Sequence, residues 1–392
     1  MGEKLYYLDN ASTTFISADV YKKMLECYTR CQCDSSSLYT FGRVSKMELE
    51  DARAKVAKAI GATPSEIYFT SGLEESNNWA IKGLARANSA KGKHVITSVI
   101  EDDSIMEACQ ELEEEGFKVT YVPVDENGVV DYAEIIKSIG PDTCLISIGI
   151  ANKEVGSLQP IRAIAELANA NGVCFHTDAS QAVGAIALSV KDLGVTSLSI
   201  SSSVIGGPKG VGALYVKEGT QIAKLIAGDS RELRAGELNI PLVAGFGLAI
   251  ETATTDLDEK VKNVRIVRKY FQKKLSEAVH NIALNGHPVA RLANNCSIMF
   301  EGAESEAVVM LLDREGICAA SSTGAENGTN APSRVLLAMG KEPEWARCSV
   351  RFTLGADITK EDVDEIVETI RKVVKRVRSI SAIRIYKNKV EL

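Results

Sequence analysis

Several residues that could do chemistry lie in short, distinctive motifs. Arg351 lies in CSVRFTLG, and a guanidinium can hold a carboxylate in a bidentate pair. Asp178 and Gln181 lie in HTDASQAVG, and Lys153 lies in ANKEVGSLQPI. Glu74 lies in TSGLEES, where a carboxylate would suit the N-terminus of a helix. Because a buried charge is costly unless it is paired, we expect Lys153 to balance nearby carboxylates.

Three of the nine cysteines, Cys27, Cys31 and Cys33, lie close together in CYTRCQC. A metal site there would need a fourth ligand, and no histidine lies nearby. We therefore expect free thiols and no metal. An odd number of cysteines spread over a long chain also indicates reduced thiols in a cytosol, so we expect a cytoplasmic protein.

Strand-like and helical runs alternate through the middle of the chain and must position these motifs. Apolar strands separated by helices that end near glycine predict a mostly parallel α/β sheet. Sheets of this kind hold their ligands at the carboxyl ends of the strands. The expected strands are 94–100, 118–124, 144–150, 173–179, 197–203 and 210–216, with helices at 104–116 and 161–172.

The pattern of predicted helices and strands changes after about residue 256. A long charged helix at 257–279 leads into a βαβ-like piece made of 297–302, 306–316 and 348–354. A last helix begins near Thr359, which is well placed as its N-cap. We therefore predict a large domain at 15–255 and a smaller one made of residues 1–14 and 256–392.

Composition excludes several classes of protein. The 392 residues are 45% hydrophobic and 25% charged, which is ordinary for a globular protein, and the length favours two domains. A net charge of −7 without a basic block argues against nucleic acid as a partner. No apolar run is long enough to span a membrane, and the first residues do not resemble a signal peptide.

Six segments in one order and spacing carry a family resemblance: YLDNASTT, IYFTSGLEESNNWAIKG, ANKEVGSLQPI, HTDASQAVG, GGPKGVGALYV and CSVRFTLG. The set resembles the class V aminotransferase superfamily, and most closely its cysteine desulfurases of the NifS/IscS type. This implies the fold type I of pyridoxal-phosphate (PLP) transferases, which is aspartate aminotransferase-like. A large domain with a mostly parallel sheet is joined there to a smaller α+β domain. It also implies PLP as cofactor, a homodimer with active sites at the interface, and a partner protein in Fe–S assembly or sulfur transfer.

The lysine that carries PLP in this family is replaced here. In relatives it follows a Ser-x-His pattern, three residues before a Gly-Pro-Lys-Gly turn. In SISSSVIGGPKG, Ser201 and Ser203 take the serine and histidine positions, and Val204 takes the lysine position. Valine has no amine and cannot form an imine. Lys209 lies inside the turn, where similar proteins keep a second lysine.

Other cofactor-site positions also differ from the family pattern. Asp102 stands at the position of the histidine that stacks on the cofactor ring. Glu74 replaces a threonine of the phosphate-binding turn, and we expect its carboxylate to fill the vacated phosphate position. Glu237, in RAGE, replaces a hydroxyl residue that the partner subunit contributes to the same phosphate.

The sulfur-accepting cysteine is missing as well. The aligned position in SSTGAENGTNAPSRVL is Ala325, and Cys318 lies seven residues earlier in an apolar run where we expect burial. Tyr39 replaces a histidine of an early family segment.

Some family residues remain. The resemblance implies that Asp178 pairs with the pyridine nitrogen, that Gln181 lies beside the phenolic oxygen and that Arg351 binds the substrate carboxylate. Each of them could instead brace the two domains or a neighbouring turn. Lys153 stands where the family has the asparagine that touches the phenolic oxygen.

These replacements favour a cysteine desulfurase-like protein without desulfurase activity. We expect it not to bind PLP normally or covalently, and to act by binding or regulation. Three alternatives stay open. Lys153 could serve as a relocated Schiff-base lysine. An acidic pocket of Asp102, Glu74, Asp178 and Glu237 could serve a PLP-free enzyme, although Lys153 weakens a metal site there. A desulfurase could also recruit residues from elsewhere in the chain.

Overall fold

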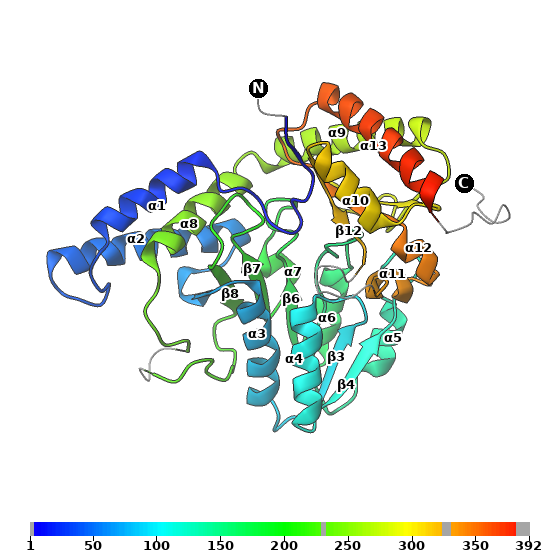
Figure 1. Ribbon diagram of the computed structural model, residues 1–392. Coiled ribbons are helices and arrows are strands. Elements are labelled where there is room, and N and C mark those ends of the chain that lie inside the picture. The colour runs from blue at the N-terminus through cyan, green and yellow to red at the C-terminus, as the bar shows by residue number, and fades with distance from the viewer. Residues whose placement is uncertain (1–3, 229–232, 324–330, 382–392) are drawn as a thin grey trace.

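The computed structural model describes residues 4–228, 233–323 and 331–381. Its central element is a seven-stranded sheet in the order β2-β8-β7-β6-β5-β3-β4 (Figure 1). The strands β3 to β7 run parallel, and only β8 is antiparallel to its neighbours β2 and β7. The prediction of a mostly parallel sheet is therefore confirmed. The strands are β2 (Ile67–Thr70), β3 (His94–Ser98), β4 (Lys118–Val122), β5 (Thr143–Ser147), β6 (Cys174–Asp178), β7 (Ser197–Ser201) and β8 (Gly212–Val216).

Helices cover both faces of this sheet, which explains why its strands, apart from β4 at the edge, are buried almost throughout. On one face, α2, α6 and α8 contribute to one large core, and on the other face α3 and α4 build a second core. The helices α1, α2 and α8 pack together at one side of the molecule (Figure 1). The helices are α1 (Ala18–Arg30), α2 (Thr40–Ile60), α3 (Leu73–Ala87), α4 (Asp103–Glu114), α5 (Tyr132–Ser138), α6 (Ile161–Ala170), α7 (Val190–Leu193) and α8 (Ile240–Thr254), with a 3-10 turn at Pro64–Glu66.

The C-terminal part forms a four-stranded antiparallel sheet in the order β12-β13-β10-β9. A short parallel pair joins the N-terminal β1 (Tyr6–Tyr7) to β11 (Ile317–Cys318). The other strands are β9 (Ile282–Leu284), β10 (Asn295–Phe300), β12 (Ala320–Ser321) and β13 (Ser349–Thr353). The helices are α9 (Leu257–Ala278), α10 (Ser305–Arg314), α11 (Arg334–Ala338), α12 (Pro343–Arg347) and α13 (Lys360–Ile380).

One sequence expectation about this part is wrong. A βαβ unit would make β10 and β13 parallel, but they pair antiparallel. The chain between them forms not only α10 but also β11, β12, α11 and α12, so it reverses direction again before β13. The predicted N-cap of the last helix is confirmed, because Thr359 and Asp362 form a capping box.

A separate apolar core supports the predicted division of the chain. Tyr6 and Leu8 pack in this core with residues of α9, α10, α13, β10 and β13. We therefore retain, as a proposal, a large domain at 15–255 and a small one at 1–14 and 256–392. Within the described residues, no helix combines the length and the apolar character that crossing a membrane requires.

A tight loop after β5 carries Lys153 and is held from within. Asn152 Oδ1 accepts hydrogen bonds from the backbone N–H groups of Glu154 (2.9 Å) and Val155 (3.0 Å). Gly156 ends the loop with φ of 77°, and a Cβ atom there would lie 2.7 Å from Cγ of Asn295. The loop geometry therefore depends on a glycine at this position.

We predict that Gly156→Ala destabilises the protein by about 2–4 kcal/mol, because left-handed strain adds to overlap with Asn295. Gly340→Ala is the matched control, since Gly340 has φ of 75° and a Cβ atom added there would have no neighbour within 4 Å. Gly340→Ala should lower the free energy of unfolding by only about 1 kcal/mol. Urea unfolding measures both, and equal losses would contradict the role given to the overlap.

Candidate ligand pocket

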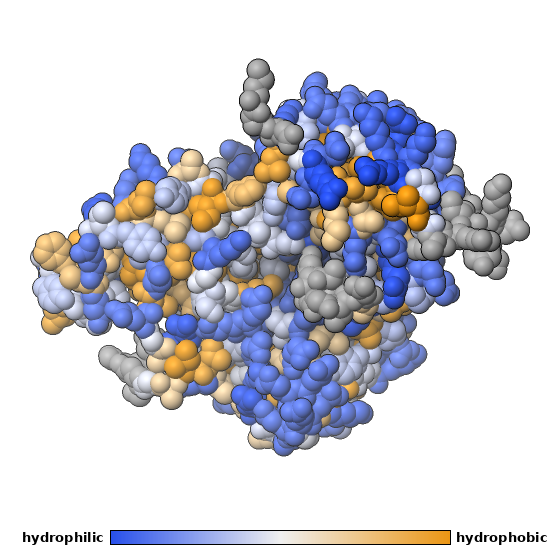
Figure 2. Space-filling model, in the orientation of Figure 1, coloured by the Kyte–Doolittle hydropathy of each residue, from blue (hydrophilic) through white to orange (hydrophobic). Residues whose placement is uncertain are grey.

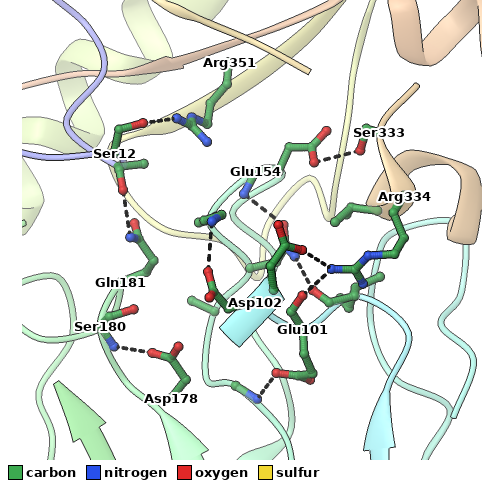
Figure 3. Close-up of a pocket in the computed structure, with 18 of the residues that line it drawn as sticks. Ser12, Glu101, Asp102, Glu154, Asp178, Ser180, Gln181, Ser333, Arg334 and Arg351 are labelled. Atoms are coloured by element: carbon green, nitrogen blue, oxygen red, sulfur yellow. Dashed lines mark hydrogen bonds and ion pairs between the residues drawn. The ribbon is translucent and has the colours of Figure 1, made fainter. Parts of the chain in front are cut away.

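A pocket of about 520 Å³ opens at the carboxyl ends of the parallel strands (Figure 3). Many of its lining residues lie within 100–103, 149–154, 178–181 and 201–204, which follow or end the strands β3, β5, β6 and β7. Residues 321–323, 331–335 and Arg351 line it from the C-terminal part. This is the edge at which parallel sheets hold ligands.

The structure brings most of the candidate residues to this pocket. Its lining includes the following nine: Glu74, Asp102, Lys153, Asp178, Gln181, Ser201, Ser203, Val204 and Arg351. Glu237 is exposed and does not line the pocket of its own chain, and neither does Tyr39. Ala325 lies outside the described residues.

A chain of polar contacts crosses the pocket floor. Lys153 Nζ lies 2.9 Å from Asp102 Oδ2, and Asp102 Oδ1 accepts a hydrogen bond from Ser104 Oγ at 2.7 Å. Asn77 Nδ2 donates to Ser104 Oγ at 3.0 Å and to Asp178 Oδ2 at 3.0 Å. Asp178 Oδ1 accepts from a backbone N–H at 2.8 Å. Lys153 is thus linked to Asp178 through three intervening side chains.

The ion pair sets the protonation state of both partners. Burial alone would raise the pKa of Asp102, but Lys153 outweighs this effect and holds the pKa below its usual value. Burial alone would lower the pKa of Lys153, but Asp102 outweighs it and raises the pKa. Lys153 therefore stays an ammonium at neutral pH. An ammonium has no free electron pair with which to attack a carbonyl carbon.

Two further carboxyl groups of the pocket form no salt bridge with any residue that the structure describes. Burial raises the pKa of Asp178, and the negative charge of Asp102 raises it further. Burial also raises the pKa of Glu101 to about 7. Glu101 accepts hydrogen bonds from Ser98 Oγ at 2.5 Å and from the backbone N–H of Gly149 at 2.9 Å.

Arg351 approaches the pocket from β13 and is held by the N-terminal segment. Its Nη2 donates to Asp9 Oδ1 and to Ser12 Oγ, both at 2.7 Å, and its side chain is only 7% exposed. Gln181 Nε2 donates to the backbone oxygen of Ala11 at 3.0 Å. Both side chains therefore brace the N-terminal segment as well as facing the pocket (Figure 3).

Three other lining residues were not singled out from the sequence: Glu101, Glu154 and Arg334. Nor were Asn77 and Ser104, which do not line the pocket but contact its carboxylates. Arg334 Nη2 donates to the backbone oxygen of Glu101 at 2.7 Å and pairs with Asp103 at 3.0 Å. Glu154 Oε2 accepts from Ser333 Oγ at 2.7 Å. Glu101 is next to Asp102 in the sequence, and Glu154 is next to Lys153. This adjacency could have indicated that both glutamates belong to the site.

The N-terminal turn of α3 holds two glutamates with different surroundings. Glu75 Oε2 accepts from the backbone N–H of Ser71 at 3.0 Å, and Arg234 Nε donates to Glu75 Oε1 at 2.9 Å. Glu74 is exposed and lines the pocket, and its Oε2 lies 3.4 Å from where a Cβ on Gly72 would be. Among the described residues, the Glu74 carboxylate forms no salt bridge or hydrogen bond of its own.

At the end of β7, a short serine cluster faces the pocket. The Oγ atoms of Ser201 and Ser203 lie 3.0 Å apart, and the backbone oxygen of Ser203 accepts from the N–H of Thr14 at 2.7 Å. Val204 follows and lines the pocket with an apolar side chain. This cluster keeps the family's serine but supplies no amine.

These residues do not fit PLP as the family holds it. The lysine position carries Val204, and the amine of Lys153 is engaged by Asp102. The phosphate turn carries the Glu74 carboxylate, which would repel a phosphate. The pocket still offers the Asp178 carboxyl, the Gln181 amide and the Arg351 guanidinium, which the resemblance assigns to the cofactor ring and the substrate.

The cysteines make no metal site among the described residues. All nine cysteines are free, with Cys27 buried and Cys31, Cys33 and Cys318 half-buried. Cys318 lies in β11 beside Tyr7 rather than in the pocket.

We predict that Glu101 makes the protein less stable as the pH rises. Its pKa is raised on folding, so the folded state binds the proton more tightly than the unfolded state does. The resulting stabilisation is full below about pH 4.5 and is lost as the pH rises through about 7. It amounts to the order of 3 kcal/mol. Urea midpoints of the wild type and of Glu101→Gln between pH 5 and 8 should diverge, and parallel curves would refute this.

The sequence and the fold both match known proteins. The Aminotransferase class-V family model matches residues 6–366. The chain is 43% identical over 380 residues to cysteine desulfurase IscS of Methanosarcina thermophila, covering 96% of this chain and 94% of that one. It is 42% identical over 377 residues to cysteine desulfurase IscS of Dictyoglomus turgidum, covering 96% of each.

Solved structures agree with this. A NifS-like protein is similar with a TM-score of 0.89 and 32% identity, covering 95% of this chain and all of the other. The NifS-like protein from Rickettsia africae gives a TM-score of 0.85 and 29% identity over the same shares. The expected PLP-type fold is thereby confirmed, and the chain belongs to the class V aminotransferase family, among relatives named cysteine desulfurase.

Proposed function

We propose that this protein is a non-catalytic relative of the cysteine desulfurases that acts by binding or regulation. The observation that carries the proposal is the pairing of Lys153 with Asp102 in a pocket whose lysine position holds Val204. One replacement removes the amine that would form an imine. The other places an ion pair where the family has an asparagine and a ring-stacking histidine.

Electrostatics at the phosphate turn supports the same proposal. A carboxylate about 4 Å from a phosphate charge costs on the order of 4 kcal/mol at an effective dielectric constant of 20. Glu74 lines the pocket at this turn, and in a family-like dimer the partner subunit would add a second carboxylate, Glu237. Two such penalties would oppose tight binding of PLP.

A second candidate is a PLP enzyme that uses Lys153. Its support is that Lys153 lines the same pocket and that its side chain is half exposed. Its difficulty is the raised pKa, because forming an imine requires the neutral amine and therefore the loss of the pair with Asp102. We therefore rank this candidate second.

We further propose a cytosolic homodimer that engages a protein of Fe–S assembly or sulfur transfer. The helix α1 exposes Tyr21, Leu25 and Tyr28, which are spaced to share one face, and α2 exposes Phe41 and Met47. Figure 2 shows apolar side chains gathered over this part of the surface, at the left of the view. A second copy would cover this apolar surface, and the nine free thiols suit a reducing compartment.

We predict that adding PLP produces no absorbance band near 390–430 nm, and that L-cysteine releases no sulfide. Calorimetry should also detect no PLP binding. A band that Lys153→Ala abolishes would instead establish the second candidate and overturn the first.

We also predict that Val204→Lys alone does not restore desulfurase activity, because Glu74 still opposes the phosphate and Asp102 replaces the stacking histidine. The triple variant Val204→Lys, Glu74→Thr, Asp102→His should bind PLP more tightly than the single variant does. Absorbance titration measures both. Activity in Val204→Lys alone would show that the electrostatic barrier is overstated.

A further inference from the structure

We propose that the pocket binds a basic α-amino acid, such as arginine or lysine, with its carboxylate at Arg351 and its distal cation at Glu74. This inference rests on the proposed function in one respect, namely that PLP does not fill the pocket. A carboxylate at Arg351 is already implied by the family resemblance. What is new is the class of ligand, which follows from charges that the pocket leaves unmatched.

The Arg351 end of the pocket keeps donors for a carboxylate. Asp9 and Ser12 engage Nη2 alone, and Nη1 forms no hydrogen bond among the described residues. Nε is buried and also has no partner there. Because a buried donor without a partner is costly, an acceptor from the ligand that bonds to this guanidinium would be favourable.

Glu154 offers an acceptor beside that position. Its Oε2 is satisfied by Ser333, but its Oε1 is buried and has no hydrogen-bond partner among the described residues. Glu154 also lies near enough to Arg351 for the two charges to interact (Figure 3). An α-ammonium group next to a carboxylate bound at Arg351 would meet this oxygen.

The opposite end of the pocket is acidic. Asp178 lies across the pocket from Arg351 (Figure 3), and Asn77 of α3 holds its carboxyl group. Glu74 lies one turn before Asn77 on the same helix, so its unpaired carboxylate belongs to this end. A cation on the far end of the ligand would meet Glu74 there.

The groups of the lining that have no partner favour this class of ligand over others. The cations are already engaged, Lys153 with Asp102, Arg334 with Asp103 and Arg351 with Asp9. Four lining carboxyl groups form no salt bridge among the described residues: Glu74, Glu101, Glu154 and Asp178. A dicarboxylate would be repelled at the far end, and a polyamine would offer no acceptor to Nε and Nη1 of Arg351. The volume of about 520 Å³ is ample for an amino acid.

Calorimetric titration of the full chain with three related ligands tests the proposal without any variant. Arginine should bind. Citrulline should bind roughly 10- to 100-fold more weakly because it lacks the distal charge. Agmatine should bind more weakly by a similar factor because it lacks the carboxylate. Equal affinities for arginine and citrulline would overturn the role of Glu74. Equal affinities for arginine and agmatine would overturn the role of Arg351.

Variants then locate the distal contact. Glu74→Gln should bring the affinity for arginine close to that for citrulline. The control is Glu107→Gln, at an exposed position on α4 outside the pocket, which should leave the ratio of the two affinities unchanged. Persistent discrimination in Glu74→Gln would contradict the assignment. A parallel PLP titration separates the two proposals. A PLP band overturns the proposed function, whereas no band together with no arginine binding overturns only this inference.

Discussion

The ion pair between Lys153 and Asp102 is the interaction on which the rest of the pocket depends. It joins the loop after β5 to the N-cap of α4, and through Ser104 and Asn77 it reaches Asp178 on β6. Separating the two partners would leave Asp102, whose side chain is only 17% exposed, without its cation, which is costly. The pair therefore fixes the relative positions of three strand ends and keeps the lysine protonated. The charge of Lys153 is therefore matched by a residue of the protein and not by a ligand.

That arrangement gives the surviving family residues a different setting. Asp178 keeps its place but is held by Asn77 and a backbone N–H group, and burial with a neighbouring negative charge raises its pKa. Arg351 keeps its place too, but Asp9 and Ser12 take one of its nitrogens. The fold of the family is kept, and we propose that the chemistry inside its pocket differs. A fold can keep its pocket after its original ligand no longer suits it.

Much of this could be read from the sequence, and the limits are physical. The alternation of apolar strands and helices predicts the central sheet, and the motifs place Glu74, Asp102, Lys153, Asp178 and Arg351 in one pocket. The antiparallel pairing of β10 with β13 could not be predicted, because it depends on how a connection of almost fifty residues folds back. Nor could Asn77, Ser104 and Arg334, since their roles arise from contacts between residues distant in the chain. Single polar residues in helices carry no signal of such contacts.

The central claim is that Lys153 pairs with Asp102 in this pocket and does not carry PLP. The most direct measurement is mass spectrometry of the full-length protein purified from cells supplied with pyridoxine, before and after reduction with borohydride. Our account predicts the mass of the unmodified chain in both samples and no retained PLP under native conditions. Stoichiometric PLP, with a reduced adduct mapped to Lys153, would contradict it.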